Sequence, residues 1–300
     1  MAESRHLAPG LWGILATPFR GADLAIDADS LGRQVGLFRE LSASGVVALG
    51  VFGEGASLDA REQREVISTV VAAGDGLPVV AGLSALRTAP AIDQARNVAD
   101  AADVPLAGLM VQVNSPQPAV LIRHLTAIHE TTGVGIVLQD YPLSSGVTIP
   151  TARLLETLES CPFVVAVKAE APPTAVAIAA LTSSTDIPVF GGLGGVGLLD
   201  ELAAGAAGAM TGFSRPEALL AALDAWNEGG MSAAHDAFSR WLPLANFETQ
   251  PGIGLALRKE VFRLRGIFAE SSVRPPAPPM PTSLRPILQQ HLDKLEMVNS

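Results

Sequence analysis

The stretch FVVAVKA, residues 163–169, is an almost unbroken apolar run that carries one charge, Lys168. Its valines favour extended backbone, and Pro162 and Pro172 lie close to its two ends. A strand with one solvated face alternates apolar and polar residues, whereas a continuous apolar run indicates burial on both faces, as in a parallel sheet. The stretch therefore predicts a buried strand of an α/β protein.

Seven further runs of this kind occur, at residues 12–17, 46–52, 78–83, 107–113, 134–139, 187–190 and 208–211. Helical patterns lie between the runs, at residues 29–41, 59–73, 90–102, 118–130, 151–158, 173–181 and 196–204. Eight strand–helix units predict a (β/α)8 TIM barrel, with an open doubly wound sheet as the alternative. Because the residues after Pro216 have mostly helical patterns, we expect a barrel over residues 1–220 and a C-terminal helical appendage over residues 221–300.

The composition limits the class of function. A net charge of −10 without a basic stripe argues against a nucleic acid or an anionic membrane as partner. The one cysteine and the five scattered histidines lack the spacing of a metal site. No apolar run is long enough to span a membrane, and the first ten residues lack the pattern of a secretory signal. We therefore expect a soluble, cytoplasmic protein that acts on a small molecule without a metal.

Lys168 is the first candidate for chemistry. An ammonium is costly to bury unless it is paired or neutralised. Burial lowers the pKa of a lysine in general, and the neutral amine is a nucleophile toward carbonyl carbons. The pattern predicts either a Schiff-base lysine or a lysine that ends its strand and extends to water. A barrel carries its site at the carboxyl ends of the strands, which is where Lys168 lies in the sixth predicted strand.

Other polar residues follow the ends of predicted strands. Glu170 is in phase with Lys168, so it is either an ion-pair partner and proton carrier or a solvated loop carboxylate. The fifth strand ends at Gln139, and Tyr141 follows in the same phase. We expect one or both of these side chains to point into the barrel mouth.

Two glycine-rich segments also follow strands. The amides of the turn Gly53-Glu54-Gly55 can bind a carboxylate, and Glu54 is either a site residue or a helix cap. The loop at 191–197 matches the GxGxxG pattern of a dinucleotide site, but no acidic residue follows at the expected spacing. We favour a loop that holds a substrate carboxylate or phosphate through Gly192 and Gly194, with glycines for close packing as the alternative. Thr211, at the end of the last strand, can donate a hydrogen bond.

These motifs resemble those of the dihydrodipicolinate synthase and N-acetylneuraminate lyase family over roughly residues 13–276. The segment Ala16-Thr17-Pro18-Phe19 looks like the family's opening strand, the GEGASL turn at 53–58 looks like its GES(A/T)xL signature, and Lys168 falls where the family has its lysine. The resemblance implies a homotetramer of (β/α)8 barrels with C-terminal helices. It also implies a lysine Schiff base on a 2-oxo acid and no separate cofactor.

The chain departs from the family pattern at several positions. Val51 and Phe52 replace its paired threonines, and Gln139 replaces its catalytic tyrosine. Ser144 falls where the synthases have a substrate-binding arginine, and Val113 where they have an interface tyrosine. The motifs QDxP and KxE look more like members that dehydrate or cleave 2-keto-3-deoxy sugar acids.

We therefore predict that Lys168 forms an imine with a 2-oxo acid and that dehydration of a 2-keto-3-deoxy sugar acid follows. The alternatives are retro-aldol cleavage to pyruvate, a dihydrodipicolinate synthase-like condensation, deamination of a cyclic imine acid, and a non-catalytic sugar-acid binding protein. The expected catalytic residues are Lys168, Gln139, Tyr141 and Glu170. The expected substrate-binding residues are Thr17, Gly53, Glu54, Gly55, Gly192, Gly194 and Thr211.

Overall fold

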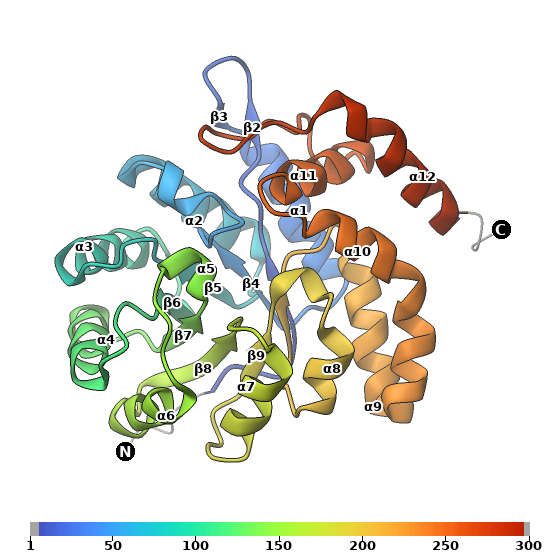
Figure 1. Ribbon diagram of the computed structural model, residues 1–300. Helices are drawn as coiled ribbons and strands as arrows, with labels where there is room; N and C mark the ends of the chain where they lie inside the picture. The colour runs from blue at the N-terminus through green and yellow to red at the C-terminus, as the bar shows by residue number, and fades with distance from the viewer. Residues whose placement is uncertain (1–5, 297–300) are drawn as a thin grey trace.

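The computed structural model describes residues 6–296 and contains a closed barrel of eight parallel strands (Figure 1). Neighbouring strands follow the order β1-β10-β9-β8-β7-β6-β5-β4 around the barrel. The strands are β1 (Gly10–Ile14), β4 (Gly45–Ala48), β5 (Val79–Gly82), β6 (Gly108–Gln112), β7 (Ile136–Asp140), β8 (Val164–Ala169), β9 (Val189–Gly191) and β10 (Gly208–Thr211). The predicted (β/α)8 barrel is confirmed, and the open sheet is excluded.

Helices surround the strands and continue into the C-terminal region (Figure 1). They are α1 (Ala28–Glu40), α2 (Ala60–Gly74), α3 (Thr88–Ala99), α4 (Pro118–Thr132), α5 (Pro142–Ser145), α6 (Thr151–Ser160), α7 (Thr174–Thr182), α8 (Leu198–Ala203), α9 (Pro216–Phe238), α10 (Leu242–Glu248), α11 (Gly254–Leu264) and α12 (Arg285–Glu296). Each of the seven predicted inter-strand helices is present. Helix α9 packs on α8 and β1, so the predicted domain boundary at residue 220 falls inside the helix that completes the barrel.

Two layers of side chains build the core. Residues on one face of each strand fill the barrel, among them Trp12, Val47, Met110 and Phe190. Residues on the other face pack against the helices. Because both faces are buried, the strands are apolar throughout, which is why they were recognisable as continuous runs.

Strand β8 contains an irregularity that decides which way its residues point. Its register against β7 pairs Ile136 with Val164 but Val137 with Ala166, so Val165 is an extra residue. Val165 and Ala166 both belong to the core inside the barrel. Without this bulge the alternation would turn Val167 inward, whereas the observed register brings Lys168 inward beside Gln139.

The C-terminal region returns across the barrel to its first elements. A short antiparallel pair that was not predicted, β2 (Phe19–Arg20) and β3 (Ala25–Ile26), lies near this region (Figure 1). The amide of Gly21 donates to Glu270 at 3.1 Å, and Arg33 Nε donates to the carbonyl of Ile267 at 2.8 Å. Over residues 6–296, no helix is long and apolar enough to cross a membrane.

Candidate active site

Three side chains from two adjacent strands form a buried polar cluster at the carboxyl end of the barrel. Lys168 Nζ lies 3.1 Å from Glu170 Oε2, and Gln139 Nε2 donates to the same oxygen at 2.7 Å. All three residues are buried, with exposed fractions of 4–6%. Of the two alternatives for Glu170, the structure contains the ion pair with Lys168, and an amine is held next to a carboxylate that can exchange protons with it.

The glycine loop after β9 supports this carboxylate. The amide of Leu193 donates to Glu170 Oε1 at 3.2 Å, and a Cβ on Gly192 would overlap the Glu170 carboxylate. The amide of Gly194 donates to Thr211 Oγ1 at 2.8 Å, with Gly194 at a φ of 72°. Gly192, Gly194 and Thr211 are predicted to hold substrate. In the structure their hydrogen bonds and close contacts position Glu170 and the loop.

Glu201 lies against the same loop and was not predicted. Its carboxylate would overlap a Cβ on Gly191, and Oε1 has no hydrogen-bond partner among the described residues. Burial, with a smaller contribution from the charge of Glu170, raises the pKa of Glu201 to about 7. Glu170 and Glu201 contact consecutive glycines, at the end of β9 and the start of the loop after it.

The turn after β4 is held by its neighbours. Thr17 Oγ1 donates to the carbonyl of Gly53 at 2.6 Å, and the amides of Glu54 and Gly55 donate to the carbonyls of Val51 and Gly50. Between residues 6 and 296 the amides of residues 51–53 donate to no protein acceptor. The amides open to a carboxylate are therefore those of 51–53 rather than those of Glu54 and Gly55.

Glu54 is an anchor rather than a free site residue. Its Oε2 pairs with Lys259 Nζ, and its Oε1 accepts from the amide of Arg274 at 2.8 Å. Lys259 is fully buried and also donates to the carbonyl of Ser272 at 2.9 Å. The prediction that Glu54 binds substrate is not supported, because both of its oxygens already accept hydrogen bonds from α11 and the segment after it.

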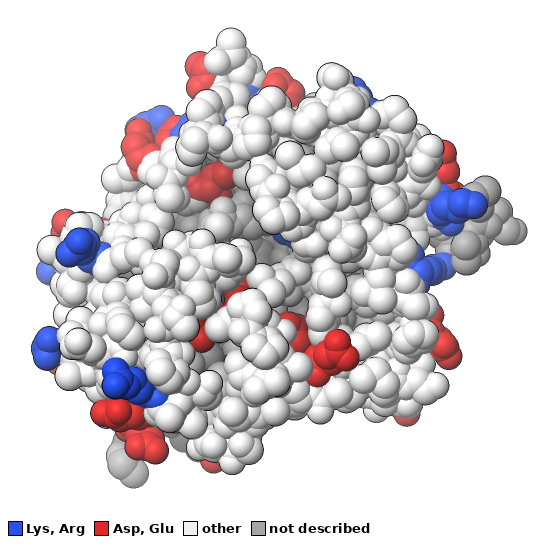
Figure 2. All heavy atoms as spheres, viewed as in Figure 1, with Lys and Arg blue, Asp and Glu red and all other residues white. Residues whose placement is uncertain are grey.

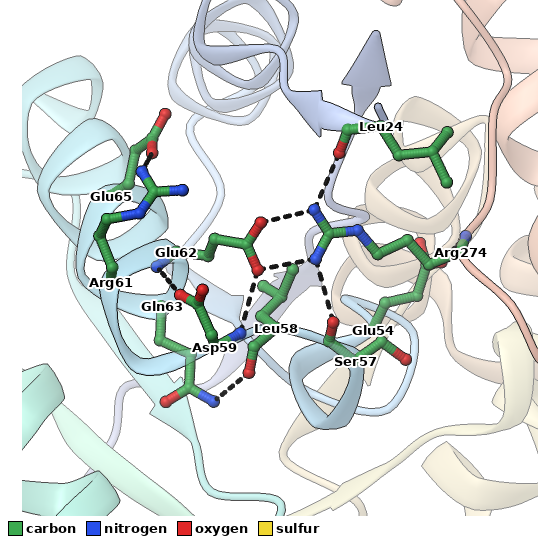
Figure 3. Close-up of polar contacts among 10 residues, drawn as sticks. All are labelled: Leu24, Glu54, Ser57, Leu58, Asp59, Arg61, Glu62, Gln63, Glu65 and Arg274. Atoms are coloured by element: carbon green, nitrogen blue, oxygen red, sulfur yellow. Dashed lines mark hydrogen bonds and ion pairs between the residues drawn. The ribbon is translucent and has the colours of Figure 1, made fainter. Parts of the chain in front are cut away.

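Arg274 clamps the C-terminal segment to the first half of the barrel (Figure 3). Its guanidinium forms two hydrogen bonds with Glu62, at 2.6 and 2.7 Å, and reaches the carbonyls of Leu24 and Ser57. Glu62 also completes a capping box with Asp59 at the start of α2. The hydrogen bond from Arg274 holds the pKa of Glu62 below its usual value.

A cavity of about 510 Å³ lies beneath this segment. Figure 2 shows the hollow near the centre of the face viewed. Its wall includes Gln139 and Gly50 from the barrel, Leu255 from α11, and Arg274 with Pro276 from the covering segment. Because Gln139 is bonded to Glu170, the cavity leads to the partner of Lys168.

Tyr141 and Arg258 flank the cluster. Tyr141 is half-buried, and both burial and the charge of Glu170 raise the pKa of its phenol. Arg258, from α11, lies over the ring of Phe52 with 4.9 Å between the guanidinium carbon and the ring centroid. Sequence reasoning missed Arg258 and Arg274, because they come from segments remote from every strand end. Over the described part of the chain, no cluster of histidine, cysteine and acidic residues could hold a metal ion.

Comparison with known proteins gives consistent matches. The model of the dihydrodipicolinate synthetase family matches residues 8–295. A Methanothrix thermoacetophila protein named 4-hydroxy-tetrahydrodipicolinate synthase is 30% identical over 95% of this chain and 96% of its own length. The dihydrodipicolinate synthase of Rhodopseudomonas palustris is 30% identical with a TM-score of 0.88, covering 96% of this chain and 97% of that structure. A monomeric dihydrodipicolinate synthase variant shares the fold at 22% identity and a TM-score of 0.87, over 99% of both chains.

Proposed function

Because the chain belongs to the dihydrodipicolinate synthetase family, whose members are lyases of the class I aldolase type, we propose that Lys168 forms an imine with the C2 ketone of a 2-oxo acid. The family works through a covalent lysine imine and uses no metal or cofactor. The observation that carries the proposal is the buried Lys168–Glu170 pair, with 3.1 Å between nitrogen and oxygen.

The cluster can supply each proton transfer of imine formation. Glu170 takes a proton from the ammonium of Lys168, and the neutral amine adds to the ketone carbon. Glu170 then returns a proton to the carbinolamine hydroxyl, which leaves as water. The free amides of residues 51–53 hold the substrate carboxylate, and Gln139 keeps Glu170 in place through its 2.7 Å hydrogen bond.

The imine then acts as an electron sink for the next step. Glu170 takes a C3 proton to give an enamine, and in a 2-keto-3-deoxy sugar acid it returns this proton to the C4 hydroxyl, which the enamine expels as water. Hydrolysis of the resulting imine releases the product and frees Lys168. We propose this dehydration as the reaction. It is supported by Gln139, because an amide at the end of β7 offers no acidic proton for the relay that a condensing synthase needs.

A second candidate is condensation of a pyruvate enamine with an aldehyde. The two relatives that are 30% identical are named as dihydrodipicolinate synthases, and these names favour condensation. It shares the imine with the dehydration, and it differs because a carbon–carbon bond forms at C3.

Reductive trapping tests the imine. Sodium borohydride with pyruvate is expected to add the mass of the reduced adduct to the peptide that contains Lys168. Lys168→Met, which is similar in length and uncharged, is expected to give no adduct, and the control Lys294→Met on α12 is expected to label normally. Labelling that survives in Lys168→Met would refute the proposal.

Product analysis separates the reactions that share the imine. A 2-keto-3-deoxypentonate is expected to give a semialdehyde and no pyruvate. Release of pyruvate with an aldehyde would identify retro-aldol cleavage instead. Consumption of pyruvate with aspartate semialdehyde would identify condensation.

The proposed assembly is a homotetramer, as is usual in the family. One chain has a mass of 31.0 kDa. Sedimentation equilibrium is expected to give four times this mass, and a single species of one-chain mass would contradict the assignment.

A further inference from the structure

Arg258 lies close enough to Tyr141 and Glu170 to interact with their charges, and within residues 6–296 its guanidinium has no hydrogen-bonded partner. Its side chain is only 10% exposed, and Leu255, one helical turn earlier on α11, lines the cavity. Residues 6–296 offer no acceptor that receives a hydrogen bond from its guanidinium, and Nε is fully buried. A buried cation whose donors are all unused is costly, so the arrangement needs a reason.

The contacts of Arg258 show where its donors face. Side chains added to Gly194 and Gly212 would meet its two terminal nitrogens, and Phe52 covers its plane. Gly194 belongs to the loop after β9, and Gly212 follows β10. The loops after the last two strands of a TIM barrel are a frequent place for anion binding.

A purely structural role would make Arg258 the counter-ion of Glu248. The two are only loosely paired, with 3.5 Å between Arg258 Nε and Glu248 Oε2. Both oxygens of Glu248 already accept hydrogen bonds from Ser214, one from its hydroxyl and one from its amide at 3.1 Å. The other buried cation of α11, Lys259, is hydrogen-bonded to Glu54 and Ser272. Glu248 balances the charge of Arg258 and leaves its donors open.

We propose that Arg258 binds an anionic group at the far end of the substrate, a second carboxylate or a phosphate, while the amides of residues 51–53 hold the carboxylate next to the ketone. This assignment rests on the proposed 2-oxo acid chemistry. It predicts that 2-oxo acids with an anion at each end are better substrates than those with one, such as a 2-keto-3-deoxypentonate. A guanidinium suits this task because its planar donors match a carboxylate or phosphate in pairs.

Calorimetric titration with matched acids tests the proposal. Glutarate has an anion at both ends, pentanoate has the same chain with one, and 4-phosphonobutanoate carries a phosphonate at the far end. The protein is expected to bind the two-ended acids more tightly than pentanoate. Arg258→Gln is expected to lose about ten- to a hundredfold of that preference, the range for hydrogen bonds to charged groups. The tighter of the two dianions identifies carboxylate or phosphate as the natural group.

Two further variants keep the test decisive if Arg258→Gln fails to fold. Glu248→Gln keeps one of the two acceptors for Ser214 and removes the opposing charge, so glutarate is expected to bind more tightly. Arg263→Gln, an arginine of the same helix bonded to Glu260, is expected to leave the preference unchanged. Equal binding of glutarate and pentanoate, or no gain in Glu248→Gln, would overturn the assignment. None of the three acids has a ketone, so the outcome is independent of imine formation at Lys168.

Discussion

Glu170 is the residue on which the proposed proton transfer at this site depends. It accepts from Gln139 and from the amide of Leu193, and it pairs with Lys168. A carboxylate held from three sides keeps its oxygen beside the amine through the successive steps of imine formation. Sequence spacing predicted the contact, because residues two apart on a strand share a face.

The first prediction concerns Glu170→Gln, which keeps the shape and removes the proton acceptor. We expect the rate of borohydride-trapped adduct formation with pyruvate to fall by about 10²- to 10⁴-fold, the usual contribution of general acid–base catalysis. Glu159→Gln, an exposed position on α6, is the control and is expected to react at the normal rate. An unchanged rate in Glu170→Gln would assign proton transfer to another group.

The second prediction concerns Glu201 and pH. Its pKa is about 7 in the folded protein and 4.5 in the absence of burial, so between these values the folded state binds more protons than the unfolded state. Stability therefore falls as pH rises through this window, by on the order of 3 kcal/mol. Urea denaturation at pH 5 and pH 8 is expected to show a smaller loss in Glu201→Gln than in the unmodified protein. Equal losses would show that Glu201 is not protonated in the fold.

Among the elements, the end of β9 and the loop after it are closely restricted by their neighbours. Gly192 contacts the Glu170 carboxylate, and Gly191 contacts Glu201. The GxGxxG match at this place reflects close approach of side chains to backbone, which was the packing alternative, and the amides serve Glu170 and Thr211.

The third prediction is that Gly192→Ala displaces Glu170 and lowers trapping at Lys168 by at least tenfold, roughly the loss of one well-placed polar contact. Gly36→Ala is the matched control, because a Cβ there meets nothing within 4 Å and the residue lies in α1. That control is expected to be stabilised by up to about 1 kcal/mol through helix propensity. Full labelling of Gly192→Ala would mean that the loop gives way without moving Glu170.

The elements themselves were predictable because burial on two faces leaves a strong apolar signature. All eight barrel strands and the seven helices between them overlap the ranges that the sequence predicted, although several strands end earlier than expected. The β2–β3 pair was missed because strands of two residues have no period. The bulge at Val165 was also missed, because a run of apolar residues hides a change of phase.

At the scale of the whole molecule, contacts between distant segments hold the cavity together. Arg274 lies 212 positions from Glu62, and Lys259 lies 205 positions from Glu54. Local patterns carry no information on such pairs, so the turn at 53–55 was predicted as a substrate site and the cations that hold it were not.

The fourth prediction compares two ion pairs of Figure 3. Arg274→Met is expected to lower the unfolding free energy by roughly 2 kcal/mol, since this pair lies between the exposed and the buried cases. Arg61→Met removes the exposed pair with Glu65 and is expected to cost well under about 1 kcal/mol. A double-mutant cycle with Glu62→Gln is expected to show coupling of about 0.5–3 kcal/mol.

The pH dependence of the unfolding free energy tests the same Arg274–Glu62 ion pair independently. The pKa of Glu62 is lowered in the fold. The ionised carboxylate therefore stabilises the fold at neutral pH, and this stabilisation is lost as the pH falls through the lowered pKa. Arg274→Met is therefore expected to be less sensitive to acid than the unmodified protein. Absence of coupling between Arg274→Met and Glu62→Gln in the double-mutant cycle would show that the segment around Arg274 is held by its other contacts.

The bulge in β8 determines which side chains of this strand point into the barrel and which point toward the helices. The surplus residue Val165 lets Val164 pair with Ile136 while Ala166 pairs with Val137. If a β8 of the same length paired without the bulge, every residue after Val165 would exchange the barrel interior for the outer wall. Val167 would then enter the interior, and Lys168 would be buried between strand and helix. Deletion of Val165, in contrast, would leave Lys168 paired with Gln139, because it removes the one residue that β7 does not match.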